Sequence, residues 1–337
     1  MTWRDQLKGD PFPWLLEAED PGPRYLTLRD LLDTPSNSSE MIDAEKKAHT
    51  DGPIAAILDK MHPDGYWEKP GPGYSPKYRS NVWSLILLAQ LGASMEMDGR
   101  IIKAINYYLE NAINPDGQIS HSSAPSGTID CLQGNMCNAL LTLGCKDPKL
   151  YKTFDWMART LTGEGMALQS DKDARYRWYA HQCGPLFACS ANDKKPCAWG
   201  AAKVMLAFGG LPKEKRTPLI DGAIRQGVEF LFSINPVQAL WLSPRNPRPN
   251  ANWWKFGFPV FYISDLLQVA EALVLLSYGG DHRLAKTLDL IRSKQDEKGR
   301  WPLEFDYKGR TWGYYGAKNQ PNKWVTLRAL KVLKAVS

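Results

Sequence analysis

Five stretches of the chain are apolar on nearly every side and end at a glycine-containing or short turn. A helix that is hydrophobic all round lies inside a protein rather than on its surface. We therefore predict inner helices in all five stretches, which cover residues 81–93, 131–145, 197–212, 265–281 and 323–335.

A second set of stretches alternates with the first and is mixed in character. Apolar residues recur there at three- and four-residue spacing, with charged residues between them, as expected of helices buried on one face only. These predicted outer helices cover residues 53–61, 99–110, 148–161, 218–232 and 282–294.

Glycine turns follow most of the mixed stretches and mark a repeat of roughly fifty residues. The turns are HPDGYW, NPDGQI, TGEGMAL and QDEKGRW, with a looser version at Asn235 and Pro236. The opening segment YLTLRDLL, from Tyr25, also resembles WVTLRALKVL, from Trp324, as expected if the two ends meet. We predict one all-α domain over residues 1–337, in which helices within residues 1–50 close a ring.

The turn at Gln295, Gly299 and Trp301 resembles the QW repeat of squalene and oxidosqualene cyclases, and PDGYW at Pro63 to Trp67 is similar without the glutamine. This resemblance to the terpenoid cyclase and protein prenyltransferase superfamily covers the chain from about residue 50 onward. It implies an (α/α)6-type toroid with inner and outer rings of helices. In that family the repeat is structural, and the glutamine and tryptophan tie an outer helix to its neighbour.

The chain also departs from these families. It has no DxDD motif, whose middle aspartate is the acid of class II terpenoid cyclases, and no DDxxD motif of the class I enzymes. It is about half as long as a two-barrel cyclase. A single barrel with different chemistry is the expectation.

Charge and hydropathy narrow the choice of partners. The 42 Lys and Arg residues exceed the 36 Asp and Glu residues by only six, and no basic run gathers the excess, so we expect no nucleic-acid partner. No segment approaches the ~20 apolar residues that span a bilayer, and the start of the chain is unlike a secretory signal. A cytoplasmic location is the default expectation.

Thiols gather near the starts of two predicted inner helices, which is where the prenyltransferase and lanthionine cyclase families hold zinc. Zinc takes about four ligands and prefers thiolate and imidazole. Cys131, Cys183 and Cys197 are the first choices here, and Cys189 or His181 completes the set. Plain buried thiols and a structural zinc are the alternatives.

Two aromatic and basic segments are candidates for substrate binding. A cation beside a helix start can bind an anion, and aromatic faces can hold an isoprenoid or a carbocation. The candidate side chains are Lys77, Tyr78, Arg79, Trp83, Trp254 and Tyr262. Solvated basic turns and aromatic core packing are the alternatives.

Asp265 and Asp130 stand at the starts of inner helices and are the candidate catalytic acids. For Asp265 the alternative is that it caps its helix, because an aspartate there satisfies free backbone N–H groups. Three hypotheses remain: a zinc-dependent enzyme acting on an isoprenoid or thiol substrate, a metal-independent terpenoid cyclase with an unorthodox acid, and a non-catalytic binding barrel.

Overall fold

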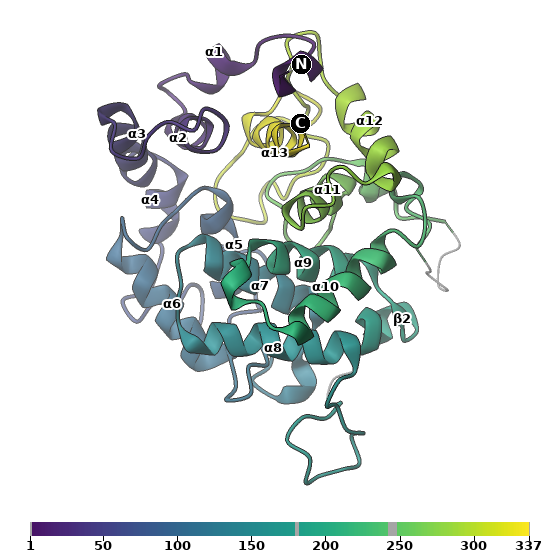
Figure 1. The fold of residues 1–337 in the computed structure, drawn as a ribbon. Coiled ribbons are helices and arrows are strands. Elements are labelled where there is room, and N and C mark those ends of the chain that lie inside the picture. The colour runs from purple at the N-terminus through teal and green to yellow at the C-terminus, as the bar shows by residue number, and fades with distance from the viewer. Residues whose placement is uncertain (1, 179–181, 242–247, 337) are drawn as a thin grey trace.

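The computed structural model describes residues 2–178, 182–241 and 248–336 and consists of helices joined by long connections. Two sets of helices surround one centre (Figure 1). The inner helices are seen nearly end-on, and the outer helices lie around them. The predicted all-α toroid is confirmed.

The inner set contains the predicted apolar helices, which pack side by side in chain order from α5 to α13, and α13 in turn contacts α2. Burial explains their composition, because in α5 every residue except Gln90 is buried. The inner helices are α2 (Pro21–Leu26) with η2 (Thr27–Leu31), α5 (Asn81–Gln90), α7 (Asp130–Thr142), α9 (Ala198–Gly210), α11 (Leu266–Leu275) and α13 (Lys323–Ala335).

The outer set contains the predicted mixed helices, which bury a single face. In α6 the buried residues include Ile101, Ala104, Ile105 and Tyr108, which follow the three- and four-residue spacing of one helix face. The outer helices are α3 (Ser39–Thr50), α4 (Pro53–Leu58), α6 (Gly99–Ala112), α8 (Pro148–Thr162), α10 (Pro218–Leu231) and α12 (Ala285–Ser293).

Shorter elements lie at the edges of the ring and in the connections. The helix α1 (Phe12–Leu15) lies near the N-terminus, and the strands β1 (Ala188–Cys189) and β2 (Lys195–Pro196) pair antiparallel in the segment before α9. The short helical turns are η1 (Trp3–Gln6), η3 (Pro125–Gly127), η4 (Pro185–Phe187), η5 (Ser190–Asn192), η6 (Lys213–Lys215), η7 (Pro236–Gln238), η8 (Ala251–Trp254) and η9 (His282–Leu284).

The glycine turns join outer to inner helices in a repeated way. The indole N–H of Trp67 donates to the carbonyl of Ile57 at 2.8 Å, and that of Trp301 donates to the carbonyl of Ile291 at 2.7 Å. In both repeats the tryptophan stands ten residues after its acceptor and is fully buried. These tryptophans therefore fasten the end of an outer helix to the turn that follows it.

The two ends of the chain meet at the ring. Gln295 accepts a hydrogen bond from the backbone N–H of Lys8 at 3.0 Å and donates to the carbonyl of Gln6 at 3.0 Å. Lys323, at the start of α13, forms ion pairs with Glu17 and Asp20. The N-terminal segment thus packs against α12 and α13.

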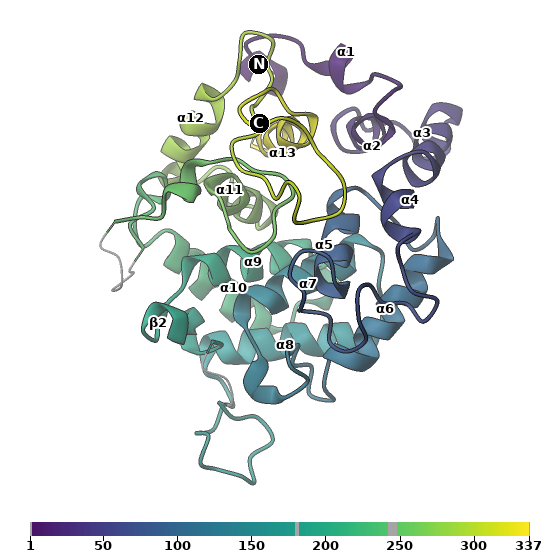
Figure 2. The ribbon, with the colours of Figure 1, turned by 180° about the vertical axis from the view of Figure 1, so that it is seen from behind.

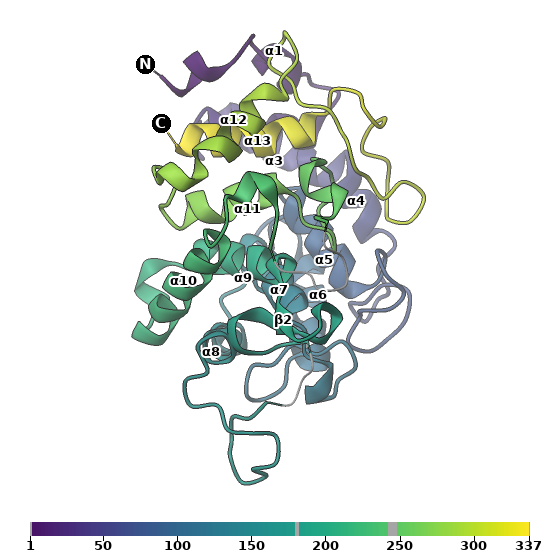
Figure 3. The ribbon, with the colours of Figure 1, turned by 90° about the vertical axis from the view of Figure 1, so that its right-hand side faces the viewer.

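The inner helices run parallel, so their N-terminal ends share one face of the ring (Figure 3). Long connections lie across that face. From behind, the segments before α11 and α13 are seen to cross it (Figure 2), and Glu304 and Phe256 join them by backbone hydrogen bonding at 2.8 Å. The C-terminal ends gather on the opposite face.

None of the described helices is both long and apolar enough to cross a membrane.

We predict that Gln295→Met destabilises the fold by about 1–3 kcal/mol, because it keeps the side-chain volume but removes hydrogen bonds from partly buried groups. Urea unfolding measures the change. Gln320→Met, at an exposed position, is the matched control. Equal stability of the two variants would contradict a role for Gln295 in holding the ends together.

Candidate active site

A cavity of about 560 Å³ lies inside the inner ring. This volume falls within the ~300–1,000 Å³ that small-molecule pockets usually have. Every inner helix contributes to its wall. More than half of the lining residues are apolar: Leu26, Ile86, Ala89, Ala139, Leu206, Phe258, Val260, Val274, Leu275, Trp324, Leu327, Val332 and Ala335.

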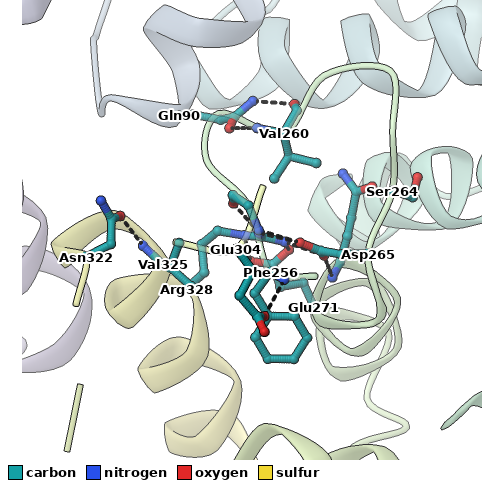
Figure 4. Close-up of polar contacts among 12 residues, drawn as sticks. Gln90, Phe256, Val260, Ser264, Asp265, Glu271, Glu304, Asn322, Val325 and Arg328 are labelled. Atoms are coloured by element: carbon teal, nitrogen blue, oxygen red, sulfur yellow. Dashed lines mark hydrogen bonds and ion pairs between the residues drawn. The ribbon is translucent and has the colours of Figure 1, made fainter. Parts of the chain in front are cut away.

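The inner end of the cavity is closed by residues 255–265, the segment that leads into α11. Gln90 donates to the carbonyl of Val260 at 2.7 Å and accepts from its N–H at 2.8 Å. Asn135 donates to the carbonyl of Phe261 at 3.0 Å. Two inner helices therefore hold this segment in place, and Figure 4 shows the Gln90 pair.

The mouth lies at the C-terminal ends of the inner helices. Leu275, in the last turn of α11, is 51% exposed, and the Lys331 side chain of α13 is 52% exposed. Both also line the cavity, so the cavity communicates with solvent on this side.

The main polar cluster in the cavity wall is centred on Arg328 and includes Asp265 and Glu271 (Figure 4). The guanidinium of Arg328 donates twice to Asp265 and twice to Glu271, each at 2.9 Å, and once to the carbonyl of Gly257 at 2.8 Å. These bonds occupy all of the N–H donors of an arginine. Asp265 also caps α11 by accepting from the N–H of Gln268 at 2.7 Å.

Burial and neighbouring charges shift the pKa values of Arg328 and Glu271. Burial lowers the pKa of Arg328, but Asp265 and Glu271 outweigh it and hold that pKa above its usual value. Burial raises the pKa of Glu271, Arg328 opposes the change and Asp265 adds to it. Glu271 therefore retains a proton more readily than an ordinary glutamate, and it lines the cavity.

Cations surround the mouth. Arg29 and Lys331 pair with Asp30 at 2.6 and 2.9 Å, and all of these residues line the cavity. Lys334 also lines it and pairs with Asp33 at 2.6 Å. The cations at the mouth are thus held in place by neighbouring carboxylates.

The predicted thiols form a second group, at the N-terminal ends of α7 and α9. Cys189 donates a hydrogen bond to Cys197, which lowers the pKa of Cys197, and backbone N–H groups of Gly200 and Trp199 add to the effect. Burial raises the pKa of Cys131 to about 12, and the charge of Cys197 contributes to that rise. The structure therefore brings Cys131, Cys189 and Cys197 close together.

Lys203 lies beside these thiols and is completely buried. Its ammonium donates to Ser264 and to the carbonyl of Trp199. Burial lowers the pKa of Lys203 to about 8, although the nearby charges of Cys131 and Cys197 oppose the shift.

Asp130 pairs with Cys183 rather than with the other thiols. Burial raises its pKa from an ordinary 3.8 to about 7, while hydrogen bonds from Cys183 and the backbone of Gly184 oppose the change. One carboxyl oxygen, Oδ2, has no hydrogen-bond partner among the described residues. Asp130 is not among the residues that line the cavity.

The predicted zinc site stays a prediction. His181 lies outside the described residues. Within the described part of the chain, no group of three or more His, Cys, Asp or Glu side chains is placed to hold a metal ion.

Four of the six predicted substrate-binding residues lie near each other at the N-terminal face. Tyr78 packs against Trp83 with ring centroids 5.0 Å apart, and both contact Phe261. The ammonium of Lys77 lies 4.9 Å from the ring centroid of Tyr262. Their contact with a substrate stays a prediction.

Tyr262 lies between these residues and the thiols, close enough to Cys131 and Cys197 to feel their charges. Burial raises the pKa of Tyr262 to about 12, and the charges of Cys131 and Cys197 contribute to the rise. Arg79 and Trp254 lie apart: the guanidinium of Arg79 stands 5.3 Å from the ring centroid of Trp312, and Trp254 donates to the carbonyl of Val237 at 2.8 Å.

Glu271 and Gln268, both in the cavity wall, were missed by the sequence reasoning. The available signal was the presence of two polar residues inside LLQVAEALVL, a helix that is otherwise apolar on all sides. Polar residues in such a helix face either a partner or an internal cavity.

No protein-family model matches the sequence, and no curated protein matches it significantly. Among solved structures the chain is similar to the type II terpene cyclase MstE from Scytonema, with 15% identity over 94% of this chain and 86% of that one and a TM-score of 0.43. A protein from Actinoplanes shows 15% identity over 87% and 98% of the two chains, with a TM-score of 0.30. A variant of MstE in complex with geranylgeranyl dihydroxybenzoate shows 13% identity over 88% and 96%, with a TM-score of 0.32. Scores of this size assign neither a substrate nor a residue role to this chain.

We predict that Asp130 makes stability depend on pH. Because its folded pKa is raised from 3.8 to about 7, its contribution to stability is complete below 3.8 and is lost as pH rises through 7. The loss amounts to roughly 4 kcal/mol. Asp130→Asn should therefore flatten the fall in unfolding free energy between about pH 4 and about pH 7, measured by urea unfolding. Asp173→Asn, at an exposed position, should leave that fall unchanged. The same steep fall in both variants would show that Asp130 is not responsible.

We predict that Cys197 is the first thiol to react with iodoacetamide near neutral pH. It is partly exposed, and its lowered pKa favours the reactive thiolate, whereas Cys137 and Cys145 are buried. Peptide mass spectrometry after short labelling times ranks the sites. Labelling of Cys145 as fast as Cys197 would contradict the prediction. Repeating the labelling with added zinc tests the predicted metal site, because a metal-bound thiolate is protected.

Proposed function

We propose that this chain is a terpenoid cyclase-like enzyme that binds an isoprenoid in the central cavity and uses Glu271 as a proton donor. The observation that carries the proposal is a largely apolar cavity with a carboxyl group of raised pKa in its wall. The QW-like turns at Trp67 and Trp301 support the choice of an isoprenoid.

The proposed reaction starts with proton transfer from Glu271 to an alkene carbon of the substrate. A C–H bond forms, the π bond breaks, and the neighbouring carbon becomes a carbocation. A second alkene of the same molecule then attacks this carbon and closes a ring. Loss of a proton to the Glu271 carboxylate ends the sequence and restores the acid.

The cavity has the groups that such a sequence needs. Phe258 and Trp324 both line it and stack with ring centroids 4.8 Å apart, so aromatic surface is available to stabilise a cation. The segment held by Gln90 closes the inner end, which limits entry of water to the mouth. A carbocation survives longer where water is excluded.

Arg328 and Asp265 serve as positioning residues in this proposal. Arg328 fixes the orientation of the Glu271 carboxyl through two hydrogen bonds. Asp265 shares the same guanidinium and accepts further hydrogen bonds from the N–H groups of Gly257 and Gln268, so it keeps Arg328 in place beside Glu271.

We predict that Glu271→Gln lowers product formation by about 10²–10⁴-fold, the usual contribution of a general acid. The assay incubates purified protein with farnesol, geranylgeraniol or squalene, with and without chelator, and detects cyclic products by gas chromatography and mass spectrometry. Glu110→Gln, an exposed residue of α6, is the matched control.

Cyclic products that persist in Glu271→Gln would assign the acid elsewhere, and Asp130→Asn is then the next variant. Saturable binding of all three compounds to the wild-type chain without any conversion would contradict the enzymatic proposal and favour a binding barrel.

A further inference from the structure

Gln268 has a polar side chain in the cavity wall that the fold does not use. It lies in the first turns of α11, is 3% exposed, and lines the cavity. Its backbone N–H donates to Asp265, but its side-chain oxygen Oε1 has no hydrogen-bond partner among the described residues.

An unpaired amide oxygen at such a position is unusual. More than nine in ten buried polar groups of folded proteins have a partner, because a polar group taken out of water without one is destabilising. A methionine or leucine would fill the same place without that penalty. The amide is therefore better explained by a ligand than by the packing of α11.

The position of Gln268 along α11 indicates which part of a bound ligand its side chain would contact. Gln268, Glu271 and Leu275 follow one another at spacings of three and four residues, and all three line the cavity. Leu275 stands at the mouth, so Gln268 lies deepest, about one helical turn beyond Glu271. The last side-chain torsion of glutamine is broad, which lets the oxygen turn toward a donor.

We propose that the ligand of this cavity carries a hydroxyl group at its inner end, which donates a hydrogen bond to Gln268. The inference rests on the proposed function and narrows its substrate class to isoprenoid alcohols, as opposed to hydrocarbons or ethers. The apolar chain of the alcohol then extends past Glu271 toward the mouth.

The test measures binding rather than turnover. Farnesol, farnesyl methyl ether and farnesene share one carbon skeleton and differ at the end that bears the hydroxyl group, where the ether has a methoxy group and farnesene has a further double bond. Titrations of the protein are followed by tryptophan fluorescence, since Trp324 lines the cavity. The wild-type chain should bind farnesol about 10-fold more tightly than the ether or the hydrocarbon, the size of one lost hydrogen bond.

Gln268→Met keeps the length of the side chain and removes the acceptor. It should lower the affinity for farnesol about 10-fold, leave the affinity for farnesene unchanged, and so abolish the preference. Gln226→Met, at an exposed position of α10, is the matched control and should retain the preference for farnesol.

Equal binding of the three compounds by the wild-type chain overturns this inference while leaving the proposed function intact. A preference that survives in Gln268→Met also overturns it, and assigns the hydroxyl to another residue. Failure of all three compounds to bind overturns the inference and the isoprenoid proposal together. The wild-type comparison does not depend on the folding of any variant.

Discussion

The cavity depends on the hydrogen bonds of Arg328. This residue of α13 joins the start of α11, the middle of α11 and the segment that closes the inner end of the ring. Breaking a buried ion pair by removing one partner typically costs ~3–5 kcal/mol, because the remaining charge is left without compensation. Without the guanidinium, two carboxylates would face each other inside the ring. Together with Gln90 and Asn135, this side chain holds the closing segment in place and so sets the depth of the cavity.

The helices were predictable from the sequence because burial leaves a local pattern. A helix buried on one face, such as α6, shows apolar residues at three- and four-residue spacing, and a helix buried on all sides, such as α5, shows almost no polar ones. The likeness of YLTLRDLL to WVTLRALKVL also predicted neighbours, since α2 and α13 are in contact. Arg29 and Arg328 stand at matching positions of these segments, and both line the cavity. Arg29 pairs with Asp30, whereas Arg328 pairs with Asp265 and Glu271 of α11. The pairing of Arg328 depends on the neighbouring helix, so it cannot be read from the local sequence.

The candidate site was less predictable, because it depends on the direction of side chains across the ring. Asp265 was recognised as a cap or an acid, and in the structure it caps α11 and pairs with Arg328. Glu271 was not recognised, although it is the carboxyl that lines the cavity. The thiols were expected to converge, and Cys131, Cys189 and Cys197 do lie close together, while Cys183 pairs with Asp130. Metal ligation requires distances within a few tenths of an ångström, which residue spacing cannot supply.

The parallel course of the inner helices has an electrostatic consequence. Each α-helix carries a partial negative charge at its C-terminal end, equivalent to roughly half an elementary charge. Because the inner helices run parallel, these partial negative charges lie on the same face of the ring, around the mouth. Lys331 and Lys334 lie in the last turns of α13, where they offset part of that field. A transient positive charge formed in the cavity would sit in a potential that the backbone itself provides.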